Sequence, residues 1–157
     1  MSNTQDVGDS TPKENFLEVV LYGVERALWD ALGKSSLAFT PRIGESLCEE
    51  LEIKACEENF ESIKEAVAAG GGALKELGIL EDIHVQVNES QIRFRVKGCM
   101  LLPIEKRLQK EGIEPFICPI MNAAVYMLRK RLGVRAKLSD INVDVGRKTC
   151  EIVFEKL

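Results

Sequence analysis

The sequence is poor in the residues and motifs on which many catalytic sites depend. His84 is the only histidine, and no serine nucleophile elbow, dinucleotide-binding fingerprint or metalloprotease motif occurs. His84 alternates with Ile83 and Val85, as an exposed strand residue does, and a general base would also need a partner group nearby. These absences favour a protein without catalysis of its own and leave an accessory enzyme as an alternative.

Long apolar stretches are absent as well. No run of about eighteen uncharged apolar residues occurs, so no transmembrane helix is predicted. The first residues, MSNTQDVGDSTPKEN, are polar and lack the apolar segment of a signal peptide. We therefore expect a cytoplasmic protein with a disordered tail over residues 1–13 and a single domain over residues 14–157. Hydrophobic residues make up 45% of the sequence, which is enough for a core.

No Cys-x-x-Cys pair occurs, yet the chain has five cysteines: Cys48, Cys56, Cys99, Cys118 and Cys150. In a cytoplasmic protein we expect reduced thiols, and the odd number favours free thiols or a metal site over a disulfide framework. Cys48 and Cys56 fall on or beside a predicted helix and are expected to be structural. The other three fall near the ends of predicted strands and helices, where functional groups are often displayed.

Cys118 begins an apolar helix and stands directly before a proline. The free backbone N–H groups and the helix dipole at such a position lower the pKa of a thiol and favour the thiolate. Cys99 and Cys150 could join Cys118 in a tetrahedral zinc site, with Asp140, Asp144 or a water as the fourth ligand. The alternative is a set of buried thiols without metal, because free cysteine often packs as a small apolar side chain.

Charge is divided unevenly along the chain. Residues 1–66 have a net charge of −8 and residues 67–157 a net charge of +4, with cations in RKRLGVRAK (129–137) and at Arg93, Arg95 and Lys97. This excess suggests an anionic partner or, alternatively, the solvated end of a helix and the exposed face of a sheet. Nucleic acid is an unlikely partner by this pattern, because no stacking aromatic residues are interleaved with the cations.

Residues 14–33 predict a long helix that ends at Gly33. Apolar residues recur at helical spacing, at Phe16, Val20, Val24 and Leu28. The apolar stripe is wider than one core-facing side requires, so the helix is expected to be buried on two sides. We predict that it pairs two copies of the chain in a homodimer; a central core helix within one chain is the alternative.

The segment TPRIGESLCEELEI predicts a second helix, with Thr40 as its N-cap and Pro41 in the first helical position. A third helix is predicted over residues 57–69. The triple glycine at 70–72 is expected to break it before a short helix over residues 73–77. A phosphate loop is disfavoured, because no Gly-Lys-Ser/Thr follows these glycines.

The remaining periodicity defines two hairpins. Alternation with a period of two predicts strands over 83–87, 92–96, 141–145 and 150–154, and helical spacing predicts helices over 103–112 and 119–133. Each strand has one apolar face. The expected fold is therefore an α+β domain with one antiparallel sheet of two hairpins, covered on one face by helices.

Several stretches together resemble the 4-vinyl-reductase type of small-molecule-binding domain: FTPRIGESLCEELE, GGALKELGIL, VKGCMLLP, CPIMNAAVYMLRKRLG and DVGRKTCEIVFE. Archaeal stand-alone members are often described as hydrocarbon-binding proteins, and the fold is shared with subunits of the transport-protein-particle (TRAPP) tethering complex. The resemblance runs over about residues 15–157. It implies a TRAPP-subunit-like fold, a homodimer and a hydrophobic pocket between helices and sheet.

In the aromatic-sensing regulators of that family, cysteines and a glutamate hold a zinc ion beside the pocket. Cys118 and Cys150 fall at matching positions. The family's glutamate and its further cysteine are not reproduced, because Ser139 and Asn142 stand near their places. Cys99 is then the residue that could replace a missing ligand.

Taken together, these patterns predict a ligand-binding or sensor domain for an apolar or aromatic small molecule. A metal held by cysteines beside the pocket is part of this hypothesis. We expect Phe39, Ile43, Leu47 and Met121 to lie near the ligand, because the second and late helices present apolar faces to the sheet. A fully packed core is the alternative. Other functions left open are a dimeric scaffold for protein assembly and a cofactor-handling accessory enzyme that uses Cys118 or the metal. No output domain is fused in this sequence, so a signal is expected to pass to a separate protein.

Overall fold

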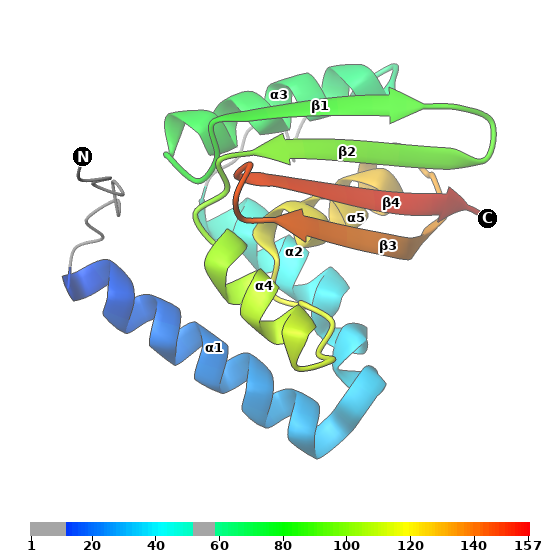
Figure 1. The fold of residues 1–157 in the computed structure, drawn as a ribbon. Coiled ribbons are helices and arrows are strands. Elements are labelled where there is room, and N and C mark those ends of the chain that lie inside the picture. Colours follow the sequence, from blue (N-terminus) through cyan, green and yellow to red (C-terminus); the bar gives the residue numbers. More distant parts are fainter. Residues whose placement is uncertain (1–11, 52–58) are drawn as a thin grey trace.

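The computed structural model describes residues 12–51 and 59–157, so most of the tail predicted over 1–13 lies outside the described residues. Two hairpins form one antiparallel sheet: β1 (Asp82–Val87) with β2 (Gln91–Lys97), and β3 (Ala136–Asp144) with β4 (Thr149–Lys156). The strand order is β1-β2-β4-β3, so the pairing of β2 with β4 joins the hairpins in the middle of the sheet (Figure 1). The predicted α+β fold is confirmed.

Alternation along the strands gives the sheet two different faces. Ile92, Phe94, Ile152 and Phe154 are buried on the inner face, where the Phe94 and Phe154 rings meet edge to face with centroids 5.7 Å apart. On the outer face the Glu151 carboxylate accepts hydrogen bonds from the arginines at 93 and 95, at 2.9 and 3.1 Å. Two of the three cations predicted on β2 thus pair with one acid of β4, and the third, Lys97, lies 4.0 Å from the Glu81 carboxylate.

Strand β3 begins five residues earlier than the hairpin predicted at 141. Leu138 lies opposite Phe154 and Ile141 lies opposite Ile152, and the register shifts between Leu138 and the residue at 140. Ser139 is the extra residue of this bulge, and its hydroxyl donates to the Val153 carbonyl at 3.2 Å. The bulge breaks the period of two that marks a strand in the sequence, which explains the late predicted start.

The helices lie along the chain as α1 (Pro12–Leu32), a 3-10 helix η1 (Gly33–Phe39), α2 (Thr40–Glu50), α3 (Ile63–Glu76), α4 (Leu102–Lys110) and α5 (Pro119–Arg131). The predicted N-cap at Thr40 is wrong by one residue. Thr40 is already helical, and the N-cap position belongs to Phe39. The reason is that η1 precedes α2 without a break, so the Thr40 N–H reaches the Leu37 carbonyl and needs no side-chain cap.

The predicted helix break at the triple glycine is also wrong, because α3 continues through residues 70–72. Ser62 is its N-cap and accepts a hydrogen bond from the Glu65 N–H at 3.2 Å. Gly70 and Gly71 are buried, and a Cβ at position 71 would overlap the Ile83 Cγ2 atom of β1. The glycines therefore allow a helix to lie close against a strand, a reason that local sequence does not reveal.

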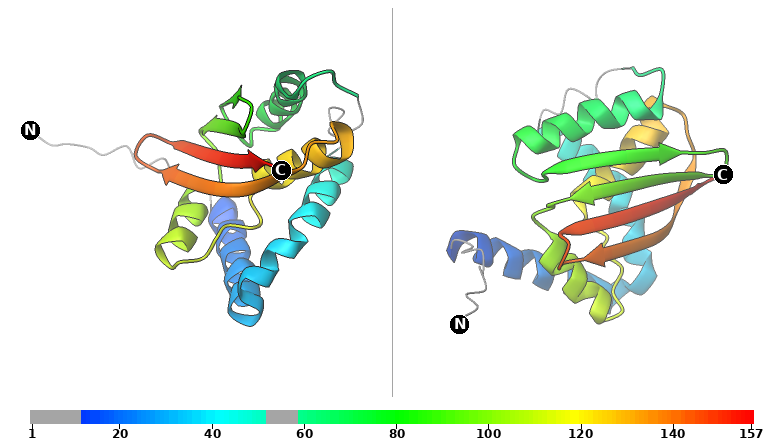
Figure 2. Two further views of the ribbon diagram at one scale, coloured as in Figure 1. Left: turned by 90° about the vertical axis from the view of Figure 1, so that its right-hand side faces the viewer. Right: turned by 45° about the horizontal axis from the view of Figure 1, so that its top comes forward.

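Helix α1 docks on α4 and not on the sheet (Figures 1 and 2). Leu21, Tyr22 and Trp29 pack against a small apolar cluster of α4 and the loop that follows it. The Tyr22 hydroxyl donates to Glu111 at 2.7 Å, and Arg26 donates to the same carboxylate at 2.7 Å. The opposite face of α1 is exposed.

Candidate functional site

A buried cluster of thiols and carboxylates lies where α4, α5 and the ends of β2 and β4 meet. Cys99, Cys118 and Cys150 are free thiols and are 5, 3 and 3% exposed, and Glu105 of α4 is 3% exposed. The Cys118 thiol is hydrogen-bonded to the Glu105 carboxylate. Glu105 also interacts electrostatically with Cys99 and Cys150. The structure thus brings the three cysteines proposed from the sequence around one acid that the sequence had not indicated.

Glu105 sets the electrostatics of this cluster. Burial raises the pKa of its carboxyl to about 7, and the hydrogen bond with Cys118 lowers it only in part. Its Oε1 atom has no hydrogen-bond partner. Burial together with the Glu105 charge raises the pKa of Cys99 to about 12, and the same two causes raise the pKa of Cys150 further.

A second buried carboxylate reaches the cluster from α1. Glu25 is 2% exposed, and burial and then the charge of Glu105 raise the pKa of its carboxyl to about 7. The backbone N–H groups of Ile117 and Phe116 hydrogen-bond to Glu25 and lower that pKa, and its Oε2 atom has no partner. Glu25 therefore ties α1 to the segment that leads into Cys118.

The expectation of a low thiol pKa at Cys118 is wrong. Burial and the neighbouring Glu105 raise the pKa of Cys118 well above its usual value. The Met121 backbone N–H lowers the pKa, as the helix N-terminus was expected to do, but its effect is the smaller one. Desolvation of a fully enclosed thiolate outweighs a few oriented N–H groups, so Cys118 is a neutral thiol in this arrangement.

Short turns and loops hold the cluster in place. Gly98 turns the chain after β2 with a φ of +64°, and its N–H donates to the Lys148 carbonyl at 2.7 Å, so Cys99 faces inward. The fully buried Asn122 of α5 donates to the Phe116 carbonyl at 2.9 Å and fixes the segment before Cys118. Cys150 lies between Val96 and Val143 in the sheet register.

The residue types suit zinc, which binds thiolates and carboxylates, and the Oε1 atom of Glu105 is buried without a hydrogen-bond partner. In the described ranges, however, no three His, Cys, Asp or Glu residues stand close enough to hold one ion as they are placed. Asp140 and Asp144 are exposed, and Asp144 accepts a hydrogen bond from the Arg147 N–H in the turn. The two aspartates considered from the sequence thus lie away from the thiols.

Glu25 and Glu105 were missed at the level of sequence, although a signal was present. Each acid interrupts an apolar stripe at helical spacing: Leu21, Glu25 and Leu28 on α1, and Leu101, Glu105 and Leu108 at the N-cap of α4 and along it. A carboxylate in such a stripe must be buried with its helix. It is therefore a candidate for paired, protonated or ligand-binding chemistry.

Cys48 is a different kind of cysteine. It is 4% exposed on α2 and is disulfide-bonded, and none of the other described cysteines is its partner. The expectation that all five cysteines are reduced is therefore wrong at this position. Sequence spacing alone does not show whether two sulfurs can approach each other closely enough to bond.

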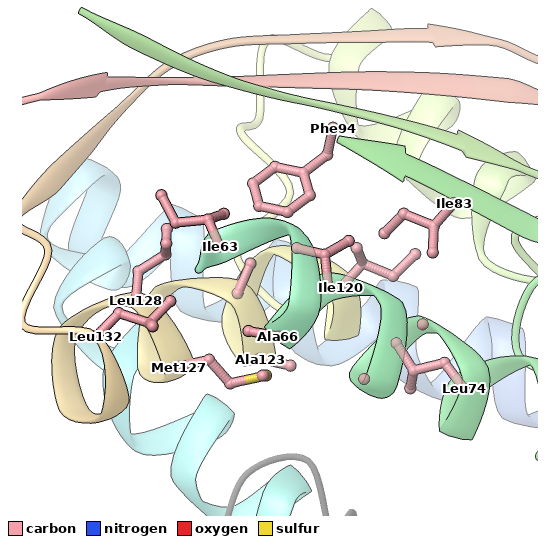
Figure 3. A pocket seen from close by; sticks show the side chains of 14 residues that line it. Ile63, Ala66, Leu74, Ile83, Phe94, Ile120, Ala123, Met127, Leu128 and Leu132 are labelled. Carbon is pink, nitrogen blue, oxygen red and sulfur yellow. The ribbon is translucent and has the colours of Figure 1, made fainter. Parts of the chain in front are cut away.

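A wholly apolar cavity of about 40 Å³ lies between α3, α5, β1 and β2 (Figure 3). Phe94 forms its roof from β2, and Ile120, Ala123 and Met127 of α5 lie across from Ala66 of α3 (Figure 3). The complete lining is Ile63, Ala66, Val67, Gly70, Gly71, Leu74, Ile83, Phe94, Ile120, Ala123, Ala124, Met127, Leu128 and Leu132. No polar side chain borders it.

The four ligand contacts predicted from the sequence do not line this cavity. Met121, 1% exposed, borders a separate groove of about 800 Å³ between the start of α2, α5 and β3. Phe39 is 43% exposed, and Ile43 and Leu47 are half-buried on α2; these three border neither space. The predicted set stays a prediction, and the cavity adds a second place for a ligand.

Comparison with solved structures shows a likeness of fold. The chain is similar to the phenol-responsive sensory domain of the transcription activator PoxR, solved with phenol, with a TM-score of 0.53 and 16% identity over 88% of this chain and 74% of that one. The family itself is shown by sequence: the chain belongs to the family described as putative rubredoxin C-terminal domain, whose model matches residues 17–157.

A relative from Methanocaldococcus jannaschii, the uncharacterised protein MJ0758, is 22% identical over 145 residues, which cover 90% of this chain and 87% of that protein. Over residues 12–51 and 59–157, no helix combines the length and apolar character that a membrane crossing needs.

Proposed function

We propose that this protein binds a small apolar or aromatic molecule and acts as a sensor domain. The observation that carries the proposal is the cavity between α3, α5 and the sheet, which is lined by fourteen residues without one polar side chain. The fold likeness to a phenol-responsive sensory domain supports it. The resemblance to the 4-vinyl-reductase type of domain, which also implies an apolar ligand, points the same way.

The cavity must widen to hold such a ligand. Its volume of about 40 Å³ is well below the roughly 150 Å³ of an apolar cavity that accepts benzene. The cavity can widen on the side of α5. Met127 there has an unbranched, adaptable side chain, and Ala123 and Ala124 have small ones. We expect α3 and α5 to move apart when a ligand is bound.

The direct test begins with native mass spectrometry of the purified protein, which reports a retained small molecule, a metal and the dimer mass together. Titration with toluene and with phenol, followed by calorimetry, then measures binding. Ala66→Leu, which fills the cavity from α3, should abolish binding. Ala68→Leu, on the exposed side of the same helix, should leave it unchanged. Binding that survives Ala66→Leu but is lost in Met121→Ala would move the site to the groove.

We further propose that zinc is held by Cys99, Cys118 and Cys150, with Glu105 as the carboxylate donor. The support is the burial of all four groups and the unpartnered Glu105 oxygen, and the side chains would have to draw together around the ion. A bound zinc would supply positive charge that stabilises thiolates in this enclosed place. No reaction is assigned to it.

Elemental analysis tests the metal proposal. Zinc near one equivalent in the wild type should be lost in Cys118→Ser and reduced in Glu105→Gln, while Asp144→Asn should retain it. Substitution by cobalt(II) adds a spectroscopic readout, because thiolate ligands give intense charge-transfer absorption. If wild type purified without chelator contains no metal, the zinc proposal is wrong and the cluster consists of buried thiols. The proposal for the apolar cavity does not depend on this result.

We also propose a homodimer through the exposed face of α1. Phe16, Val20 and Val24 are 66, 45 and 45% exposed there, and Leu28 is half-buried beside them. A second copy would cover these side chains, which lie opposite the face that docks on α4. A dimer that retains no ligand would favour the alternative function, a scaffold for protein assembly. We also propose that the protein is located in the cytoplasm.

A further inference from the structure

The segment from the end of α5 to the start of β3 carries the largest group of unpaired cations in the described part of the chain. Arg129, Lys130, Arg131, Arg135 and Lys137 fall within nine residues, and none forms an ion pair with a described residue. Elsewhere the arginines are engaged, as Arg26 is with Glu111 and Arg93 with Glu151. The negative end of the α5 dipole accounts for the cations of its last turn, but Arg135 lies beyond the helix.

Two recesses lie beside these cations. The first, about 250 Å³, lies between α2 and α5, where Tyr126 is bordered by Arg129 and Lys130. Arg42 and Glu45 also line it and form an ion pair with each other at 2.6 Å. The second, about 230 Å³, has an apolar floor that includes Leu128, Val134 and Phe154. Arg129 and Arg135 stand on the border of this second recess. Arg129 borders both recesses. Cations therefore lie at the rims of recesses that an apolar side chain could fill.

We infer that this surface, the basic end, is the docking site for a protein segment that carries carboxylates around an apolar side chain. The basic end is defined as Arg129, Lys130, Arg135 and the two recesses. Guanidinium groups pair with carboxylates through two parallel hydrogen bonds, and an apolar anchor in a recess would be the energetic centre of such a contact. A nucleic acid would use the cations but not the apolar floor of the second recess, so an acidic protein segment fits better.

The basic end also adjoins the apolar cavity. Leu128 of α5 and its C-cap residue Leu132 line that cavity, while Arg129 and Lys130 between them are exposed. A ligand that displaces the end of α5 would therefore displace the docking cations. Only this link rests on the proposed function, because the docking surface is defined without a ligand.

The experiment uses a fluorescein-labelled, glutamate-rich peptide with a central leucine as the probe, and it follows binding by anisotropy at low and at moderate salt. Salt-dependent binding is expected, with a loss of about tenfold or more in the double variant Arg129→Glu/Arg135→Glu. The matched control Lys64→Glu/Lys110→Glu makes the same change in net charge at two other exposed cations that form no ion pair with a described residue, and it should bind as the wild type does. Thermal unfolding verifies that both variants are folded.

The inference would be overturned by no binding to wild type, by equal loss in both double variants, or by tighter binding of a DNA duplex of the same charge. A probe with glycine in place of leucine should bind more weakly, because the recess is then unfilled; equal affinity would also count against the site. Adding toluene tests the link to the cavity. Peptide binding without any toluene binding would support the basic end and contradict the proposed function.

Discussion

The thiol of Cys118 is hydrogen-bonded to the carboxylate of Glu105, and each residue is 3% exposed. A buried acid thus stands where a helix N-terminus alone would have favoured a thiolate. The consequence is that the metal-free cluster is built from neutral thiols whose ionisation is opposed by burial and by a neighbouring negative charge. Thiolates would therefore form in this cluster only if a bound cation offset these two effects.

The first prediction concerns thiol reactivity. In metal-free native protein, Cys99, Cys118 and Cys150 should resist alkylation by iodoacetamide at neutral pH, because each is buried and its pKa is raised. Mass spectrometry after a timed reaction measures the labelling, and a denatured sample provides the fully labelled control. Rapid modification of Cys118 in the folded state would show that the thiolate forms there after all.

The second prediction concerns pH. The pKa of Glu25 rises from 4.5 to about 7 on folding, so the folded state holds its proton more tightly than the unfolded state does. The resulting stabilisation is complete below pH 4.5 and is lost as the pH rises through 7. The free energy of unfolding of the metal-free protein should therefore fall between pH 5 and pH 8 (by up to about 3 kcal/mol for this group).

Chemical denaturation at the two pH values, with a chelator present, measures that change. Glu25→Gln should reduce the fall, and Glu18→Gln on the same helix should not. A wild-type stability that is constant or that increases over this range would contradict the burial of a protonated Glu25.

The third prediction compares two neighbouring glycines of α3. Gly71→Ala should destabilise the fold by about 1–3 kcal/mol, because its Cβ would overlap Ile83. Gly72→Ala meets nothing within 4 Å and should be neutral or stabilising by up to about 1 kcal/mol, since alanine is the better helix former. Equal effects in urea denaturation would mean that α3 does not lie against β1 as described.

The fourth prediction tests the dimer. Light scattering should show a dimer for the wild type and a monomer for Val20→Glu/Val24→Glu, because burying each such apolar side chain contributes about 1.5–3 kcal/mol. Leu77→Glu, at a residue that is 50% exposed at the end of α3, is the matched control and should stay dimeric. A wild type that is monomeric at tens of micromolar, an order-of-magnitude working concentration, would remove the proposed interface.

The order of helices and strands could be predicted because it depends on local periodicity. Ile92, Phe94 and Val96 alternate with charged residues and form a strand as expected, and Gly33 follows the last residue of α1. Features that depend on distant contacts were not predictable in this way. The bulge at Ser139 obscures the start of β3, and continuous α3 depends on a strand residue, Ile83, that comes later in the chain.

The sequence analysis singled out the three thiols of the candidate site and passed over its two acids, although both acids interrupt apolar stripes. The positions of Cys99, Cys118 and Cys150 at the ends of elements suggested a shared metal site, which stays a prediction; in the structure each of the three interacts electrostatically with Glu105. The protonation state could not be derived from the helix start, because burial is a property of the whole fold. The burial of Glu25 depends on how α1 docks on the rest of the domain, and that packing is not specified by a local pattern.

The central pairing of β2 with β4 determines the order in which the molecule can be completed during synthesis. Residues 91–97 can pair with residues 149–156 only after the latter are synthesised, and until then the β2 edge of the β1–β2 hairpin is unpaired. Such a non-local pairing makes folding slow relative to helix formation and leaves the emerging chain open to association. A nascent chain halted before β4 should therefore be a client of chaperones, although its helices and first hairpin are already present.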